Sequence, residues 1–473
     1  MKKPNQNQDR SRRLLQIPSP GGKVAPKGSE EECGQKSESQ YTSSDLRQGW
    51  SQDERSTRSS EGPSSNIAAR IPLQSPIGSE EPIGDSFPPV EALGAPRRLR
   101  ICAVLLALFL LFECTYCVAV FTDWVPALTD LRNQYIETAL GTMNHKWLAT
   151  AFIPGDIVMA VKSEMDAARE AQLGQNSSGW ETEDIPQNRD FFELFPELEP
   201  SAVRAWSPVP EAELEGLSVN YAGLDEVGLD LDTRQGDQVL AIDAKNGLLV
   251  VRIREEFFRG VLILGKDPGR LSCAAAENWG VSGQRAGQIA EDHDALVALT
   301  ASGFEADGPE GAYQTGASMC GGIAYGDHLK PGYKRLELRT DDRLYVTDAP
   351  EDFHPACTDA AEWTPALIVD GKIVVTKEDH YNARNPRCCL GQAADGTVLM
   401  LCIEGRYFDS LGATAPECAE ILARYGACQA MNLDGGTSAI CWYQGEYITR
   451  CSDPDLPEGR LLPNAWIYRG IEN

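Results

Sequence analysis

Residues 430–439 read AMNLDGGTSA, an apolar run that ends in a polar turn with two consecutive glycines. We expect Asn432 and Asp434 to lie on the same side, because alternate residues of a strand share a face. Gly435 and Gly436 then allow the backbone to turn tightly and to approach a ligand with no Cβ atom in the way. The stretch therefore predicts a strand that ends in a candidate ligand-binding or catalytic turn.

The turn after the glycines adds hydrogen-bonding groups. Thr437 and Ser438 supply hydroxyls and backbone N–H groups, and such a concavity suits an anion like phosphate. The alternative is a plain strand-to-turn corner in which Asp434 caps its own turn. Composition alone does not decide between the two interpretations, since D-G-G is common in loops.

Two neighbouring segments look as if they belong to the same site. Residues 385–391 read NPRCCLG and enter a strand, and Arg387 offers a planar fork that matches phosphate or carboxylate. Residues 399–406 read LMLCIEGR, a strong strand in which we expect Glu404 and Arg406 to share one face. For each arginine the alternative is a surface ion pair that contributes little to stability.

From about residue 236 the sequence changes to short apolar runs bounded by turn residues, which predict strands. Asp370-Gly371 lies between two such runs and predicts a hairpin. Residues 416–425 predict a helix, because their apolar side chains recur on one face. We therefore expect residues 236–473 to form an α+β domain, a mixed sheet with flanking helices. The expected strands cover residues 239–241, 248–252, 260–265, 295–299, 366–369, 372–375 and 398–403.

Residues 101–121 read ICAVLLALFLLFECTYCVAVF, with Glu113 as the single charged side chain. This length is close to the ~20 residues needed to cross a bilayer core. A basic cluster at residues 97–100 precedes the run and Asp123 follows it, so the positive-inside rule places the N-terminus in the cytoplasm. We predict a single transmembrane helix at residues 97–122 with the C-terminal domain outside the cytoplasm. The alternative is a buried core helix.

The segments on either side of this helix have different compositions. Residues 1–96 are rich in Ser, Gln, Pro, Glu and Arg and poor in aromatics. Such a segment buries too little apolar surface to offset its backbone entropy, so we predict a disordered cytoplasmic tail. Residues 123–235 contain helical stretches and predict a membrane-proximal stalk or linker.

The net charge is concentrated after the apolar run. The chain has a net charge of −27; residues 1–100 hold 15 basic and 13 acidic side chains, which leaves 28 basic and 57 acidic for the remainder. This acidic balance argues against nucleic acid as the partner, because binding to phosphates needs positive surface.

The cysteines are also concentrated there, with ten of the 14 in residues 273–451. An even number in an exported domain permits disulfides, although their connectivity cannot be read from the sequence. A metal site is the rival interpretation, but paired C-x-x-C units are missing and histidines are few. Free buried thiols are a further alternative. No cofactor is expected. Carboxylates near Asp434 are oxygen ligands of the kind that hold a divalent cation, but no ligand spacing in the sequence indicates such a site.

The late motifs resemble the phosphodiester glycosidases, a family that includes uncovering-enzyme-like domains and bacterial membrane-anchored members associated with exopolysaccharide. The last of these motifs keeps the family's Arg-x-x-x-Asn spacing through Arg460 and Asn464. The resemblance covers about residues 240–473, with agreement in order, spacing and residue identity. It rests on NPRCCLG (385–391), ADGTVLMLCIEGR (394–406), TAPECAEILARYGACQAMNLDGGTSA (414–439) and GRLLPNAWIY (459–468).

The resemblance implies a membrane-anchored, extracytoplasmic hydrolase that cleaves sugar-1-phosphodiester linkages, such as those of N-acetylglucosamine, in a cell-surface or exopolysaccharide glycopolymer. Asp434 would serve as acid or base with Glu404 as its partner, since a carboxylate pair is common in glycosidases. The implied substrate-binding groups, with the two arginines of the strands as phosphate clamps, are Arg387, Arg406, Asn432, Gly435, Gly436, Thr437, Ser438, Arg460 and Asn464.

Some residues depart from the family pattern. Cys388 and Cys389 stand where the family has Thr-Ala, and Glu404 stands where it has Asp. The departures around Thr300 and Cys388 motivate one alternative, a non-catalytic module that binds glycopolymers. Another alternative is a scaffold in exopolysaccharide export or assembly, with the N-terminal tail as its contact.

Overall fold

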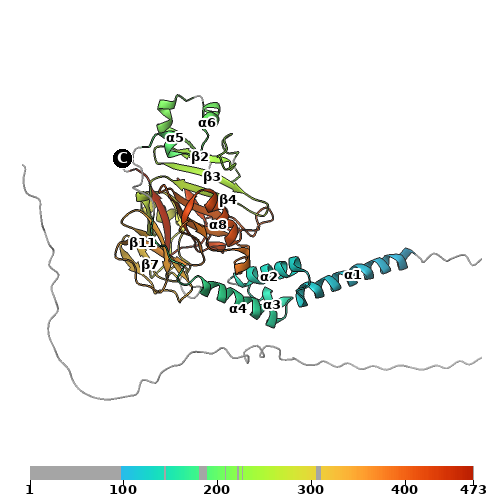
Figure 1. Cartoon of the computed structure of the whole chain (residues 1–473). Coiled ribbons are helices and arrows are strands. Elements are labelled where there is room, and N and C mark those ends of the chain that lie inside the picture. The colour runs from blue at the N-terminus through green and yellow to red at the C-terminus, as the bar shows by residue number, and fades with distance from the viewer. Residues whose placement is uncertain are drawn as a thin grey trace, which may run out of the picture. The chain divides into compact units, whose positions relative to one another are not determined.

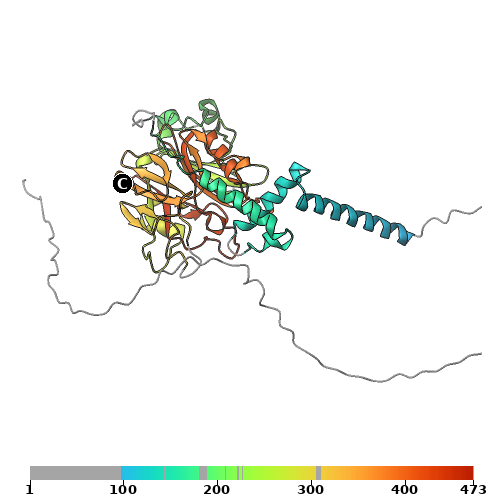
Figure 2. The ribbon, with the colours of Figure 1, turned by 60° about the horizontal axis from the view of Figure 1, so that its bottom comes forward.

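The computed structural model describes residues 97–471, apart from 143–144, 181–188, 208, 221–222, 226 and 305–309. The predicted disordered tail at residues 1–96 lies outside the described residues. Layers of strands with helices packed around them make up the described part (Figures 1 and 2). This mixture of helices and antiparallel sheets agrees with the predicted α+β class. The expected mixed sheet is wrong, because the described strands form three sheets in which neighbours pair antiparallel.

The largest sheet has nine strands, and each strand pairs antiparallel with its neighbours. The hairpin predicted at Asp370-Gly371 is confirmed, because the last two strands of this sheet pair around it. The order along the sheet is β1 (Ser218–Asn220), β2 (Val239–Asp243), β3 (Leu248–Arg254), β4 (Arg259–Gly265), β15 (Val398–Ile403), β14 (Arg387–Ala393), β16 (Ala427–Asn432), β12 (Ala366–Val369) and β13 (Lys372–Ile373).

Two five-stranded sheets accompany it in the described part of the chain. One has the order β10 (Leu344–Asp348), β9 (Lys334–Arg339), β11 (Cys357–Trp363), β7 (Ser318–Cys320) and β8 (Ile323–Tyr325). The other has the order β18 (Glu446–Tyr447), β17 (Cys441–Tyr443), β6 (Ala295–Thr300), β19 (Asn464–Arg469) and β5 (Leu271–Ala275).

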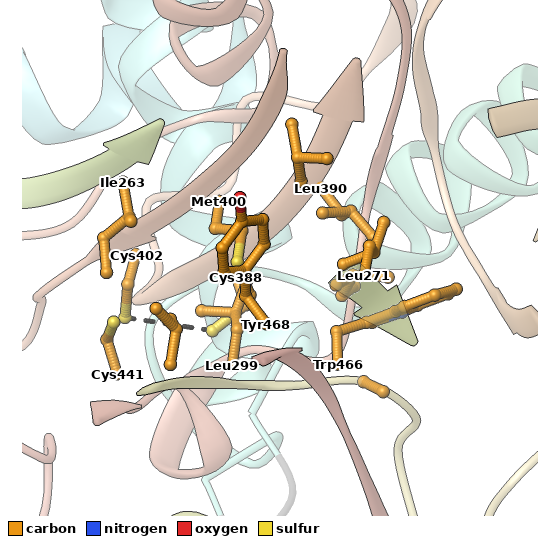
Figure 3. Close-up of a cluster of buried hydrophobic side chains, with 14 of the residues drawn as sticks. Ile263, Leu271, Leu299, Cys388, Leu390, Met400, Cys402, Cys441, Trp466 and Tyr468 are labelled. Atoms are coloured by element: carbon orange, nitrogen blue, oxygen red, sulfur yellow. Dashed lines mark hydrogen bonds between the residues drawn. The ribbon is translucent and has the colours of Figure 1, made fainter. Parts of the chain in front are cut away.

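One face of the nine-stranded sheet packs against the smaller sheets. Because side chains alternate along a strand, each central strand sends every second residue into this core. Figure 3 shows the core with side chains from β4, β14 and β15 facing those from β5, β6, β17 and β19. The labelled members are Ile263, Leu271, Leu299, Cys388, Leu390, Met400, Cys402, Cys441, Trp466 and Tyr468.

The opposite face of the same strands forms a second core with α8 (Ala415–Arg424). Thr414 and Glu417 form a capping box at the start of this helix, close to the predicted start at residue 416. Apolar residues of α5 (Phe191–Leu194), α6 (Pro200–Trp206) and the chain up to residue 231 join this core. Described residues between 191 and 231 therefore pack with the strands, although the sequence alone placed this stretch in a linker that ends at 235.

The first helix, α1 (Arg97–Phe121), is long and apolar enough to cross a membrane. Three helices follow: α2 (Pro126–Leu140), α3 (Leu148–Ala151) and α4 (Gly155–Ala171). They lie beside the end of α1 (Figure 1). With that end they form a small core in which Val120 and Ile136 are buried. The remaining short elements are η1 (Glu211–Gly216), η2 (Pro268–Arg270), α7 (Ala286–Asp292), η3 (Lys377–Asp379) and η4 (Gly436–Ser438).

The chain after α4 is tied to the strands by polar contacts. The Gln172 side chain accepts from the Ala366 N–H and donates to the Ala366 carbonyl, both at 3.0 Å, as a neighbouring strand would. Lys334, which is fully buried, donates from Nζ to Asp348 at 2.7 Å and to the Asn176 side chain at 2.8 Å.

Every described cysteine is a free thiol. The disulfides expected for an exported domain are therefore not found among the described residues. Sulfur atoms do lie near each other, with Sγ–Sγ distances of 3.6 Å for Cys273 and Cys320 and 3.8 Å for Cys388 and Cys402. These buried thiols pack as small apolar side chains.

We predict that Lys334→Met lowers the free energy of unfolding by about 3 kcal/mol, because it leaves the Asp348 carboxylate without its charged partner. Lys330→Met, at an exposed position nearby, is the matched control and should stay within about 0.5 kcal/mol of wild type. Urea unfolding of the solubilised full chain measures both. Equal losses for the two variants would contradict the role given to the Lys334 contacts.

Candidate active site

The sheet register brings the predicted segments to one edge. Strand β14 lies between β15 and β16 and is antiparallel to both, with Arg387 opposite Ile403 and Cys389 opposite Asn432. The start of β14 therefore lies beside the ends of β15 and β16. The chain segments that follow Ile403 and Asn432 therefore leave the sheet near the start of β14.

The D-G-G turn leaves the sheet at this edge and packs against the segment before β14. The Asp434 N–H donates to the Ala301 carbonyl at 3.2 Å, and the Gly436 N–H donates to the Pro386 carbonyl at 3.0 Å. A Cβ atom at position 435 would lie 2.5 Å from the Pro386 carbonyl oxygen, and Gly436 has a φ of +61°. Both positions therefore require glycine, as the sequence indicated.

Asp434 is a half-buried carboxyl group with a shifted pKa. Burial raises its pKa from 3.8 to about 6, against the opposing effects of the Ser438 hydroxyl, the Gly435 N–H and the charges of Arg460 and Arg406. A carboxyl group with this pKa changes its protonation state near neutral pH, where proton transfer to or from substrate is most effective.

Two arginines flank the turn without a carboxylate partner among the ion pairs of the described residues. Arg387 donates to the carbonyl oxygens of Ala413 at 3.1 Å and Ala383 at 2.7 Å. Arg406 donates from Nη1 to the Thr437 hydroxyl at 3.1 Å and to a second hydroxyl at 3.3 Å. Neutral oxygens orient these guanidinium groups but leave their positive charge available to an anion.

Glu404 is placed differently from the expectation. Strand β15 ends at Ile403, and Arg406 adopts a φ of 66°, so Glu404 and Arg406 do not share a strand face. The Glu404 side chain is fully buried and accepts from Arg259 Nε at 3.0 Å and from Arg450 Nε at 2.8 Å. Its other oxygen accepts from the Arg450 N–H at 2.6 Å. Both carboxylate oxygens therefore accept hydrogen bonds from arginines, and Glu404 does not pair with Asp434 in the way that the sequence led us to expect.

The two predicted asparagines contact protein groups. Asn432 is buried and its Nδ2 donates to the Thr364 carbonyl at 2.7 Å. Asn464, at the start of β19, accepts from the Ser302 N–H at 3.0 Å and donates to its hydroxyl at 3.1 Å. These contacts hold the segments next to the turn in position.

Arg460 belongs to the charged surroundings of Asp434, whose pKa it lowers. Its Nε donates to Glu310 at 2.7 Å, and its guanidinium lies 4.2 Å from the centre of the Phe304 ring. The structure therefore brings the charges of Arg460 and Arg406 close to Asp434 in the D-G-G turn.

Sequence reasoning missed the arginines that bind Glu404. Arg259 and Arg450 lie 145 and 46 positions from it, and no motif or spacing links them. Both also pair with Asp409, at 3.4 Å and 3.1 Å, so they fix the loop that carries Arg406. Among the residues that the structure describes, no group of three or more His, Cys, Asp or Glu side chains could hold a metal ion.

We predict that Asp434→Asn stabilises the protein at pH 7. Because the folded pKa is raised, the folded state binds more protons than the unfolded state between about pH 4 and pH 6, so wild-type stability falls as the pH rises through this range. The amide avoids that cost, which is at most about 3 kcal/mol at pH 7 and disappears near pH 4. Thermal unfolding at both pH values measures the difference; Asp455→Asn, at an exposed position, should show none.

Comparisons with known proteins identify a family to which part of the chain is similar. The family model described as "Phosphodiester glycosidase" matches residues 293–469. A Bacillus subtilis (strain 168) protein, "SPbeta prophage-derived uncharacterized protein YomE", is 28% identical over 176 residues. That match covers 35% of this chain and 27% of the B. subtilis protein, so the chain spans about a quarter of that relative.

Two solved structures give weaker similarities. The zebrafish N-acetylglucosamine-1-phosphodiester alpha-N-acetylglucosaminidase catalytic domain has 16% identity and a TM-score of 0.39, over 47% of this chain and 82% of that chain. A hypothetical protein from Synechocystis has 15% identity and a TM-score of 0.37, over 49% and 63%. The resemblance found in the motifs is confirmed by the family model: residues 293–469 match the phosphodiester glycosidase family.

Proposed function

We propose that the domain hydrolyses a sugar-1-phosphodiester, releasing the sugar and leaving a phosphomonoester. The observation that carries this proposal is the raised pKa of Asp434 beside Arg406 at the glycine turn. We assign Arg387, whose backbone lies beside Gly435, as the second cation. A carboxyl group that titrates near pH 6 can move a proton, and two guanidinium groups can bind a phosphate.

The chemistry of the leaving group assigns the role of Asp434. When the bond from C1 to the bridging oxygen breaks, its electrons stay on a phosphomonoester that the arginines can bind as an anion. Protonation of this oxygen therefore contributes little. Ionised Asp434 takes a proton from the attacking water, whose hydroxyl adds to C1.

Glu404 has a different role in this proposal from the catalytic one implied by the family resemblance. Its carboxylate holds Arg259 and Arg450, which in turn hold the loop with Arg406. We assign it as a positioning residue. The Thr437 hydroxyl accepts from Arg406 and can still donate to a phosphate or sugar oxygen. The Ser438 hydroxyl and the Gly435 N–H contact Asp434, and the Gly436 N–H donates to Pro386, so these groups shape the turn.

The proposed substrate and location follow the family. The zebrafish enzyme's name gives N-acetylglucosamine as the sugar, and we propose a related phosphodiester in a cell-surface or exopolysaccharide glycopolymer. We further propose that α1 crosses the membrane once, with the arginines at residues 97–100 in the cytoplasm and the domain outside.

A non-catalytic module that binds glycopolymers is the second candidate, because this chain departs from the family pattern at Cys388 and Cys389. Both side chains are fully buried, one in each of the two cores that cover the sheet. The departures therefore alter packing more than the surface of the site, which favours the enzyme.

We predict that Asp434→Asn lowers kcat/KM at least 100-fold on a synthetic N-acetylglucosamine-α-1-phosphodiester, because the amide cannot accept a proton. For wild type, kcat/KM should rise with pH through an apparent pKa of about 6. Release of reducing sugar by the solubilised full chain measures both. Binding without turnover by the wild type would reject the enzyme and leave the glycopolymer-binding module.

We also predict that Arg406→Gln raises KM at least tenfold, because it removes a charge-assisted hydrogen bond to the phosphate. Arg254→Gln, at an exposed position at the end of β3, is the matched control and should leave KM unchanged. The same assay applies. An unchanged KM in Arg406→Gln would show that the phosphate does not contact this side chain.

A further inference from the structure

Large aromatic side chains are exposed around the end of α1. Trp124, three residues after the helix, is 82% exposed. Trp147 and Phe152, which flank α3, are 61% and 65% exposed. Single exposed aromatics are common, but a group of them beside an apolar helix indicates an interaction surface.

A hydrogen bond fixes the level of α3 relative to α1. The Tyr116 hydroxyl donates to the Phe152 carbonyl. Tyr116 also packs against the core of α2, α3 and α4. A second tyrosine, Tyr135 of α2, donates to the Leu148 carbonyl at 2.8 Å. The short helix α3 is therefore attached to both α1 and α2.

The position of Tyr116 in α1 gives the depth of this attachment. At 1.5 Å per residue, Tyr116 lies about 7.5 Å before Phe121 along the helix axis. The 21 residues from 101 to 121 span about 31 Å, which matches a hydrocarbon core of ~30 Å. When α1 fills that core, Tyr116 lies inside it. Because the Tyr116 hydroxyl contacts the Phe152 carbonyl, Phe152 lies within the length of one tyrosine side chain from the core.

Polar contacts at the end of α1 indicate where the hydrocarbon core meets water. Arg132 Nη1 donates to the Val120 carbonyl at 3.2 Å, and its Nη2 donates to Asp123 at 3.1 Å. The Val120 carbonyl is one of the last four of α1, which lack partners within the helix. A charged cap at this point places the boundary with water between Tyr116 and Arg132.

We propose that Trp124, Trp147 and Phe152 form an aromatic collar that inserts into the outer interfacial layer of the bilayer. The proposal rests on the proposed membrane span, but not on the proposed hydrolase activity. Aromatic side chains favour this layer because their rings are apolar and tryptophan also carries an N–H group for water or headgroups.

The collar also orients the candidate site. Glu137 of α2 accepts from the Asn382 N–H at 2.7 Å, and the Arg384 N–H donates to the Thr138 hydroxyl at 3.1 Å. The segment containing Asn382 and Arg384 leads directly into Arg387. The helices that carry the collar therefore hold the start of β14 as well.

The test uses tryptophan emission from the full chain in phosphatidylcholine vesicles whose acyl chains are brominated either near the headgroup or deep in the core. We expect shallow bromine atoms to quench more strongly than deep ones. The double variant Trp124→Phe and Trp147→Phe should lose at least half of the quenched emission. Trp206→Phe, in α6 and away from the collar, should retain all of it and is the matched control.

The outcomes separate the proposals. Release of the protein from membranes at alkaline pH would reject the span and the collar with it. A protein that remains embedded but shows the same quenching in the double variant as in wild type would reject the collar alone. If a second copy of the chain covers these tryptophans, bromine cannot reach them. The double variant would then show the same quenching as wild type, and the collar would again be rejected. None of these readouts depends on turnover.

Discussion

The antiparallel register of β14 between β15 and β16 is the constraint on which the candidate site depends. It sets Arg387 opposite Ile403 and brings the end of β16 to the same edge. Slipping either pair by one residue would turn every side chain to the other face of the sheet. Burial of alternate residues in two different cores opposes such a slip, so apolar packing also fixes the positions of the charged groups.

A buried ion cluster completes this edge. The Glu404 carboxylate is enclosed by Arg259 and Arg450, and removal of either charge would leave an unbalanced group away from water. The cluster therefore keeps the loop after β15 in one arrangement. That loop presents Arg406 to the glycine turn.

The sequence predicts the local parts of this site well. The turn at Gly435-Gly436 and the helix before β16 follow from residue type and periodicity, which act over a few residues. Glu404 shows where such reasoning ends. Its two-residue spacing from Arg406 predicted a shared face, but β15 ends first, and its partner Arg259 lies 145 positions away. Contacts over that distance depend on the packing of whole sheets, as does the packing of residues 191–231.

The acidic body makes the local cations important. Residues 101–473 hold 57 acidic and 28 basic side chains, which disfavours the approach of an anionic polymer. At physiological salt, charges beyond about 8 Å are largely screened. The groups within that distance of a bound phosphate decide its affinity, which is why the proposed function assigns this role to Arg406 at the glycine turn.

The contacts between α2 and the segment before β14 have a consequence for kinetics. They prevent the site from moving independently of the helices that follow α1. If the chain is the membrane-anchored hydrolase proposed above, a substrate attached to the same bilayer is confined with it to a thin layer, where short tethers give effective concentrations in the mM range. Weak intrinsic binding is sufficient under such confinement, and rapid product release becomes compatible with efficient capture. The same phosphodiester released into solution would be a far poorer substrate.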